Sequence, residues 1–414
     1  MRHVIVGNGP AGVVAAETLR AQRPADEITL LGDEPEPPYS RMAIPYLLHG
    51  GIGEEGTYLR KSPGHFDRLG IALVHGHAAA LDTVARQAVL SDGRALPFDR
   101  LLLTVGSSPV SPPIPGIDLA GVLTCWTLAD ARRLAASVHD GARVIQLGAG
   151  FIGCIIMESI VARGAGLTLL EMADRMVPRM MPPGASALMR QWCEARGVRV
   201  MTGTRVTAIE RTASGLRATT ASGEHLDADV IISATGVRPN IAWLAGSGVA
   251  TGTTGILVDH LLATSVEGIY AAGDCVESEE LGTGTRIVNA VQPDAVDQAR
   301  IAALNMAGRP ARLQGTLQMN VLDTFGLVSS SFGQWQGVAG GDSVEISDPR
   351  DRRYLRLEFE GDVLIGATSL GLTEHVGVIR GLIQGRTRLG PWKAKLLRDP
   401  TRLPDAYVAS MQVA

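Results

Sequence analysis

Several features are scarce in this chain of 414 residues, and each scarcity excludes a class of protein. The four cysteines, at positions 125, 154, 193 and 275, form no CxxC pair, which argues against a zinc ribbon or a disulfide framework. The formal charge is −4, so the chain lacks the electrostatic footprint of a nucleic-acid binder. The longest nearly apolar stretch, residues 144–157, is shorter than the roughly 20 residues that span a bilayer. We therefore expect a protein without a membrane span and, by default, a reducing cytoplasm.

The composition indicates a folded protein with several domains. Hydrophobic residues make up 45% of the chain and charged residues 19%, which excludes a disordered or fibrous chain. At roughly 100–200 residues per domain, the length allows two to four domains. Glycine is abundant, with 49 residues, and so many glycines predict close approaches of the backbone to itself or to a ligand.

Two segments about 140 residues apart share one pattern of strand, glycine turn, helix and strand. In the first, the strand 4–6 runs into GNGPAG at residues 7–12, and a strand at 28–31 follows the helix. In the second, the strand 144–147 runs into GAGFIG at residues 148–153. Such turns let main chain approach a pyrophosphate at the N-terminus of a helix. The repetition, each time between a strand and a helix, predicts two dinucleotide-binding units.

Acidic residues close the second strand of each unit, where a carboxylate can accept the hydroxyls of an adenosine ribose. In the first unit this is Asp33 or Glu34, and in the second it is Glu171. Because no lysine or arginine directly follows Glu171, the sequence favours NADH over NADPH. A solvated surface acid is the alternative interpretation of Glu171.

Three further strands each end in a glycine turn, at Gly106, Gly236 and Gly273. Asp274 follows the last of them, where a carboxylate can bind a hydroxylated chain or cap the next turn. From about residue 310 the pattern changes. Strands at 354–359 and 363–367 and a helix at 375–384 predict a small α+β domain.

These motifs, in this order, resemble the FAD-dependent pyridine nucleotide-disulfide oxidoreductase superfamily over residues 2–308. Ferredoxin reductases, rubredoxin reductases and the flavin half of assimilatory nitrite reductase are the most similar members. The resemblance implies an α/β fold with two Rossmann-like dinucleotide-binding domains, for FAD and NAD, and a small C-terminal α+β domain. The expected boundaries are 1–115 with 245–308 for FAD, 116–244 for NAD(H) and 309–414 for the C-terminal domain.

The resemblance also implies roles for individual residues. One set would bind FAD: Gly7, Gly9, Pro10, Ala11 and Gly12 at the pyrophosphate, Asp33 or Glu34 at the ribose, Arg41 at the phosphates or ribityl chain, Ala78 at adenine, and Asp274 at the ribityl hydroxyls. A second set would bind the nicotinamide nucleotide: Gly148, Gly150, Ile152, Gly153 and Glu171. Ala295 would open a helix whose dipole points at the flavin, and Gly106, Gly236 and Gly273 complete the cofactor-binding positions.

The chain departs from the superfamily at two places. Residues 40–46 contain no cysteine, and Met42 stands about where the redox cysteine of disulfide reductases would be, so a thiol relay is not expected. Tyr46 and Ile155 replace the lysine–glutamate pair of ferredoxin reductases. No catalytic side chain and no metal site is predicted.

The predicted function is therefore that of an FAD-dependent NADH:acceptor oxidoreductase. The acceptor would be a small iron–sulfur or rubredoxin-type protein, with a quinone, oxygen or another subunit left open. Two alternatives remain. One is an FAD- and NAD-binding subunit or redox sensor without turnover, and the other is the flavin subunit of an amine or imino-acid dehydrogenase. No nucleic-acid partner is expected, and a homodimer is left open.

Overall fold

The computed structural model describes residues 1–411, which divide into two compact units. The first contains residues 1–47, 52–108 and 237–317, and the second contains residues 48–51, 109–236 and the described residues from 318 onward. Each unit contains one of the two glycine turns. Among residues 1–411 no helix is both long and apolar enough to cross a bilayer.

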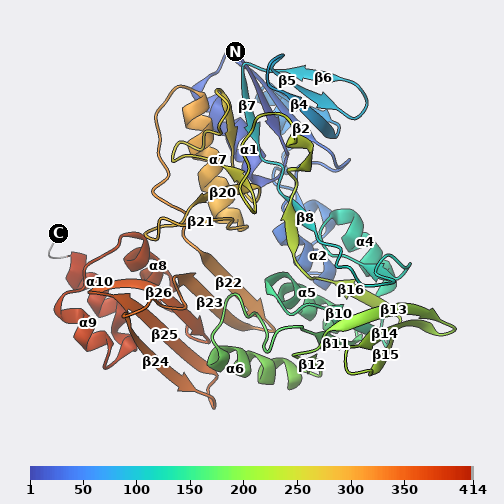
Figure 1. The fold of residues 1–414 in the computed structure, drawn as a ribbon, viewed down its shortest axis with the longest axis vertical. Coiled ribbons are helices and arrows are strands. Elements are labelled where there is room, and N and C mark those ends of the chain that lie inside the picture. Colours follow the sequence, from blue (N-terminus) through green and yellow to red (C-terminus); the bar gives the residue numbers. More distant parts are fainter. Residues whose placement is uncertain (412–414) are drawn as a thin grey trace. The chain divides into compact units, whose positions relative to one another are not determined.

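The first unit is built on a five-stranded parallel sheet with helices against it (Figure 1). The strand order is β19 (Ile269–Ala271), β7 (Arg100–Leu103), β1 (Arg2–Val6), β2 (Glu27–Gly32) and β3 (Ile71–His75). The helices α1 (Pro10–Gln22) and α7 (Gln292–Met306) pack against each other. Short helical segments follow β2 and lie before β3: η1 (Arg41–Ala43), α2 (Ile44–His49), η2 (Glu54–Thr57) and α3 (His65–Arg68).

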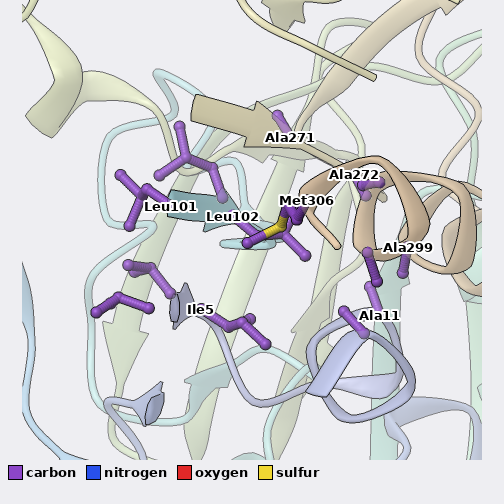
Figure 2. Close-up of a cluster of buried hydrophobic side chains, with 14 of the residues drawn as sticks. Ile5, Ala11, Leu101, Leu102, Ala271, Ala272, Ala299 and Met306 are labelled. Carbon is purple, nitrogen blue, oxygen red and sulfur yellow. The ribbon is translucent and has the colours of Figure 1, made fainter. Parts of the chain in front are cut away.

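Small side chains allow α1 and α7 to lie close together over the sheet. Figure 2 shows Ala11 of α1 and Ala299 of α7 beside Ala272, which follows β19. Ile5 and Leu102, from the central strands β1 and β7, lie in the same buried cluster. This core fixes the carboxyl ends of β1, β7 and β19, from which the first glycine turn and Asp274 emerge.

Smaller sheets complete the first unit. One consists of β4 (Ala78–Asp82), β5 (Gln87–Leu90) and β6 (Ala95–Pro97), and another of β18 (Ile256–Leu257), β20 (Val276–Glu279) and β21 (Arg286–Ile287). The strands β8 (Ser107–Pro109) and β17 (Val237–Pro239) pair where the chain passes between the two units, and η3 (Ala242–Leu244) follows.

The second unit contains a sheet of the same design. Its order is β12 (Arg199–Met201), β11 (Gly166–Leu170), β10 (Arg143–Leu147), β16 (Val230–Ser233) and β9 (Val122–Leu123), all parallel. The helices are α4 (Leu128–Ser137), α5 (Phe151–Ala162) and α6 (Pro183–Glu194), and β13 (Val206–Thr212), β14 (Gly215–Thr220) and β15 (His225–Ala228) form an antiparallel sheet. In both units the glycine turn leaves the middle strand, next to the point where the strand order reverses, which is where doubly wound sheets bind ligands.

The C-terminal part of the second unit is an antiparallel sheet with helices. The strand order is β22 (Met319–Thr324), β23 (Leu327–Gly333), β26 (Val363–Leu370), β25 (Arg353–Glu360) and β24 (Asp342–Asp348). The helical segments α8 (Val376–Gln384), α9 (Pro391–Leu396), η4 (Pro400–Arg402) and α10 (Leu403–Met411) follow. The two predicted strands are β25 and β26, which pair antiparallel on either side of Gly361. The assignment of FAD and NAD(H) to domains with the boundaries given above stays a prediction.

Candidate functional site

The first glycine turn is closed on one side by main chain and open on the other. Gly7 has φ +110°, and a Cβ there would lie 2.1 Å from the carbonyl oxygen of Thr104. A Cβ at Gly12 would lie 1.9 Å from the carbonyl oxygen of Gly7. At Gly9, in contrast, a Cβ would meet nothing within 4 Å. The turn therefore needs glycine for its own packing at two positions, and at the third it is open to an approaching group.

The N-terminus of α1 begins at this open position. Gly9 is the N-cap and forms no side-chain capping bond. Pro10, which has no N–H, occupies the first position of the helix. The N–H groups of the first turn therefore have no side-chain acceptor at the cap, and the helix dipole adds partial positive charge. An anionic group such as a pyrophosphate fits this position.

The structure separates the two acids that the sequence left open in the first unit. The side chain of Asp33 is 59% exposed and lies 3.3 Å from Nδ1 of His77, the residue before Ala78. Glu34 is more buried and accepts hydrogen bonds from Tyr39 Oη at 2.6 Å and Arg41 Nη2 at 2.8 Å. Glu34 and Arg41, both predicted FAD ligands, thus form one ion pair.

Asp274 lies directly after Gly273, and both are fixed from neighbouring elements. The Gly273 N–H donates to Gln298 Oε1 of α7 at 2.9 Å, and Ser107 Oγ donates to Asp274 Oδ2 at 3.4 Å. Burial raises the pKa of the Asp274 carboxyl, while the nearby Arg41 and the Ser107 hydroxyl act in the opposite direction. A desolvated carboxylate of this kind gains from hydroxyl donors, which a ribityl chain supplies.

The helix start predicted at Ala295 lies three residues earlier, at Gln292. Val291 is the N-cap, and the Ala295 N–H already donates to the Val291 carbonyl at 3.1 Å. Its own N–H is thus used inside the helix, and any donors for a ligand belong to the residues before it. Ser40 Oγ donates to Gln292 Oε1 at 2.7 Å, which ties the Ser40–Arg41 segment to this helix end.

The turn after β7 is connected to the chain that returns from the second unit. Gly106 has φ +61°, and a Cβ there would meet nothing within 4 Å. The Asn240 N–H donates to the Gly106 carbonyl at 3.0 Å, and Asn240 Nδ2 donates to the Val105 carbonyl at 3.0 Å.

The second glycine turn repeats the geometry of the first. Gly148 has φ +99°, and a Cβ there would lie 2.5 Å from the carbonyl oxygen of Ala234. A Cβ at Gly153 would lie 2.4 Å from the carbonyl oxygen of Gly148, whereas one at Gly150 would meet nothing within 4 Å. Gly150 is the N-cap of α5 without a side-chain cap, and Ile152 lies in the first turn. The residues present therefore fit a second dinucleotide.

Glu171 follows β11 directly and is bonded to the turn. Its Oε2 accepts the Ala149 N–H at 2.7 Å, and its Oε1 accepts the Ala173 N–H at 2.8 Å. Gly236 lies beyond the neighbouring strand with φ +122° and an open Cβ position, and its carbonyl accepts the Val110 N–H at 2.9 Å. The structure thus brings Glu171 to the glycine turn, and its role as a ribose ligand stays a prediction.

Val177 is a strained residue beside the same turn. It is 2% exposed, has φ +42° and precedes a proline, although both β-branching and a following proline disfavour that backbone. Its N–H donates to the Ala149 carbonyl at 2.8 Å. Nothing in the sequence indicates this contact.

All four cysteines are free and buried. Burial raises the pKa of the Cys125, Cys193 and Cys275 thiols to about 12, and that of Cys154 well above its usual value. Such thiols are poor nucleophiles at neutral pH. Met42 and Tyr46, in contrast, are 49% and 65% exposed. Within residues 1–411, no cluster of three or more histidine, cysteine or acidic side chains is arranged to hold a metal ion.

Comparison with known proteins places this geometry in a family. The family model for pyridine nucleotide-disulphide oxidoreductases matches residues 1–301. An NADH-dependent phenylglyoxylate dehydrogenase subunit epsilon from Aromatoleum evansii is 33% identical over 96% of this chain and 95% of its own length. An NADH oxidase from Methanocaldococcus jannaschii is 31% identical over 78% of this chain and 73% of its own. The reductase of a covalent putidaredoxin reductase–putidaredoxin complex superposes with a TM-score of 0.91, at 25% identity and 99% coverage of both chains.

The chain belongs to the pyridine nucleotide-disulphide oxidoreductase family. It is an FAD-dependent NAD(P)H oxidoreductase, and its fold is that of two-domain FAD/NAD reductases. The predicted family, fold class, cofactors and reaction class are thereby confirmed.

Proposed function

We propose that the first glycine turn binds FAD, that the second binds NADH, and that electrons leave to a small external redox protein. When bound, FAD would accept a hydride from the nicotinamide and pass electrons onward, so the chain itself need supply only binding, orientation and electrostatics. The open turns at Gly9 and Gly150, each at an uncapped helix N-terminus, support the placement of the two pyrophosphates.

The FAD side of the proposal assigns a role to each charged group near the first turn. Glu34 takes the adenosine ribose and is oriented by Tyr39 and Arg41, while Arg41 also reaches the phosphates or ribityl chain. Asp274 binds the ribityl hydroxyls, and Ala78 offers main chain to adenine. The N-terminal end of α7, at Gln292, points its dipole at the flavin in the place first assigned to Ala295.

The NADH side depends on Glu171. Each of its two oxygens accepts a hydrogen bond from a main-chain N–H group, and these bonds orient the carboxylate beside the turn. Such a carboxylate accepts the ribose hydroxyls of NADH and repels the 2′-phosphate of NADPH. Preference for NADH over NADPH follows from this charge.

The single observation that supports an external acceptor is the state of the cysteines. All four are buried with raised pKa values, and Met42 and Tyr46 occupy the segment where a redox cysteine would be expected from the family. Without an accessible thiol pair near the first turn, the electrons must leave the protein. An iron–sulfur or rubredoxin-type protein is the proposed acceptor, in line with the structural similarity to a reductase complexed with putidaredoxin.

The test is an anaerobic stopped-flow mixing of the FAD-loaded protein with NADH. Bleaching of the flavin band near 450 nm within the first second is the expected result, followed by reoxidation when a small iron–sulfur protein is added. Binding of NADH without bleaching would contradict the assignment of a reductase. Glu171→Arg is the matched control, because it should slow bleaching by NADH and leave the flavin spectrum unchanged.

A subunit of a larger dehydrogenase is the second candidate. The similarity to a dehydrogenase subunit extends over nearly the full length of both chains, which favours it. In that case another chain sets the electron flow, and the flavin of the isolated protein should still bleach with NADH but reduce no small carrier protein. A cytoplasmic location and a homodimer stay predictions.

A further inference from the structure

Gln146 is a polar residue in the middle of a buried parallel strand. It lies on β10, is 0% exposed and has Ile145 and Leu147 as its apolar chain neighbours. Its Nε2 donates to the Gly148 carbonyl at 3.0 Å, while its Oε1 is buried without a hydrogen-bond partner among residues 1–411. An unpaired buried acceptor destabilises the fold. Gln146 is therefore not explained by stability.

The first unit shows that this sheet position does not require a polar side chain. Val6 precedes Gly7 and pairs with Leu31, as Leu147 precedes Gly148 and pairs with Leu170. The residue equivalent to Gln146 is therefore Ile5, which is fully buried. An isoleucine builds the same strand and the same turn.

The first unit nevertheless supplies a side-chain donor to the equivalent carbonyl, that of Gly7. Thr104 Oγ1 donates to the Gly7 carbonyl at 2.9 Å. The equivalent of Thr104 in the second unit is Ala234, because each N–H donates at 2.8 Å to the carbonyl of the residue before the first glycine. Alanine has no hydroxyl. Each turn thus has one side-chain donor to its first glycine carbonyl. In the first unit the donor, Thr104, follows the neighbouring strand β7, whereas in the second unit the donor, Gln146, lies on β10, the strand that runs into the turn.

In the second turn this bond acts on Glu171. The Gly148 carbonyl and the Ala149 N–H belong to one planar peptide group. Gln146 Nε2 holds the oxygen of that group and Glu171 Oε2 holds its N–H. Gly153 is needed here as well, since a Cβ there would lie 2.7 Å from Gln146 Nε2. Rotation of the peptide would withdraw the donor that orients the Glu171 carboxylate.

We propose that Gln146 is a positioning residue for the dinucleotide, which fixes the Gly148–Ala149 peptide and through it the carboxylate of Glu171. Thr104 fills the corresponding role for the Gly7 carbonyl in the first turn. The inference rests on the proposed function, in which Glu171 binds the adenosine ribose of NADH. Gln146 therefore sets the affinity for NADH and its discrimination from NADPH without touching either.

The test uses the FAD-loaded protein, titrated calorimetrically with NAD⁺ and NADP⁺ so that no turnover occurs. Gln146→Met keeps the length of the side chain and removes both polar atoms. Loss of one hydrogen bond that orders the site should raise the Kd for NAD⁺ about three- to tenfold. The Kd for NADP⁺ should change less, so the preference for NAD⁺ over NADP⁺ should become smaller. The melting temperature of the variant should equal or exceed that of the wild type. Gln146→Leu is the second variant if the methionine variant does not fold.

A rescue variant separates positioning from packing. Gln146→Ile combined with Ala234→Thr gives the second turn the donor arrangement of the first. This double variant should regain most of the NAD⁺ affinity that Gln146→Ile alone loses. Loss in the single variant without recovery in the double variant would contradict the role of the carbonyl donor.

Glu171→Gln distinguishes a failure of the inference from a failure of the proposed function. If Glu171→Gln alone leaves NAD⁺ binding unchanged, the ribose assignment is wrong. If Glu171→Gln weakens binding and a folded Gln146→Met binds NAD⁺ as the wild type does, the inference is wrong. The two changes should also be less than additive together, because they act on one peptide group. Full additivity would refute action through Glu171.

Discussion

The charged carboxylate of Asp274 should destabilise the folded apoprotein and should strengthen the binding of FAD. Burial raises the pKa of this group, which means that the folded protein prefers its protonated form. A folded-state pKa above the unfolded value contributes stability at low pH that is lost as pH rises through the folded-state pKa. Asp274→Asn removes the charge and keeps the shape, so the apoprotein variant should be more stable than wild type at pH 7.

The same substitution should weaken FAD binding. A hydrogen bond from a ribityl hydroxyl to a charged acceptor contributes about 1.5–3 kcal/mol, and an amide oxygen gives roughly half of that. Asp274→Ala would lose the whole bond, which corresponds to a rise of about ten- to a hundredfold in the Kd for FAD. Asp274→Asn should fall between this variant and the wild type.

Two measurements check this pair of opposite effects. Quenching of FAD fluorescence gives the Kd of each apoprotein variant, and thermal melting at pH 5 and pH 7 gives the pH dependence of stability. The apparent gain in stability of Asp274→Asn should shrink at pH 5, where the wild-type carboxyl is closer to protonation. A variant that keeps FAD as tightly as wild type, or an apoprotein whose stability gain is independent of pH, would refute the reasoning.

Three further predictions concern other parts of the chain. Glu171→Arg should raise the Km for NADH at least tenfold and lower that for NADPH, as steady-state kinetics with both nucleotides will show; an unchanged preference would remove Glu171 from the ribose. Thr104→Val should increase FAD loss on dilution several-fold while NAD⁺ affinity of the loaded protein stays the same, since its hydroxyl holds the Gly7 carbonyl. His3 is buried with its Nδ1 unpaired among the described residues, and burial lowers the pKa of its imidazole. Stability of the folded protein is therefore lost as the pH falls through the folded-state pKa of His3. The melting temperature of His3→Gln should depend less on pH between pH 7 and pH 5.

The local elements were predictable because composition and periodicity decide them. The strands around both glycine turns and the two C-terminal strands β25 and β26 lie within a few residues of their predicted positions. Short β-branched runs beside glycine turns admit few other structures. The start of α7 was placed too late, since the sequence offers no capping side chain at Val291 to mark it.

Register was the part of the site that periodicity left undetermined. From the sequence, an acid closes the second strand in both units. The pairing aligns Leu31 with Leu170, however, so the position of Glu171 corresponds to Gly32. A Cβ at Gly32 would lie 2.1 Å from Asn8 Nδ2, so a side chain of the turn fills that space. Asp33 and Glu34 therefore lie one and two residues further on. A one-residue difference of this kind changes which side chain reaches the turn.

Contacts made by loops that are distant in the sequence could not be predicted either. The positive φ of Val177 costs on the order of 1–3 kcal/mol, and only the surrounding packing reveals that its N–H reaches the Ala149 carbonyl. Gln146, in contrast, is visible in the sequence as a polar residue within the apolar stretch 144–157, and Thr104 lies two residues before Gly106. Both became interpretable once the structure showed which carbonyl each contacts.

In the proposed assignment, discrimination between the cofactors originates in the acids beside the two turns. Their glycines and helix ends are alike, so the proposed binding of a pyrophosphate depends on the same geometry in both. The acids differ, because Glu34 is paired with the cation Arg41 whereas Glu171 is held by two uncharged main-chain N–H groups. The Arg41 cation offsets much of the negative charge of Glu34, whereas the main-chain partners of Glu171 carry no net charge. Repulsion of a 2′-phosphate is therefore expected only at the second turn, and the groups that orient Glu171 set how strong that repulsion is.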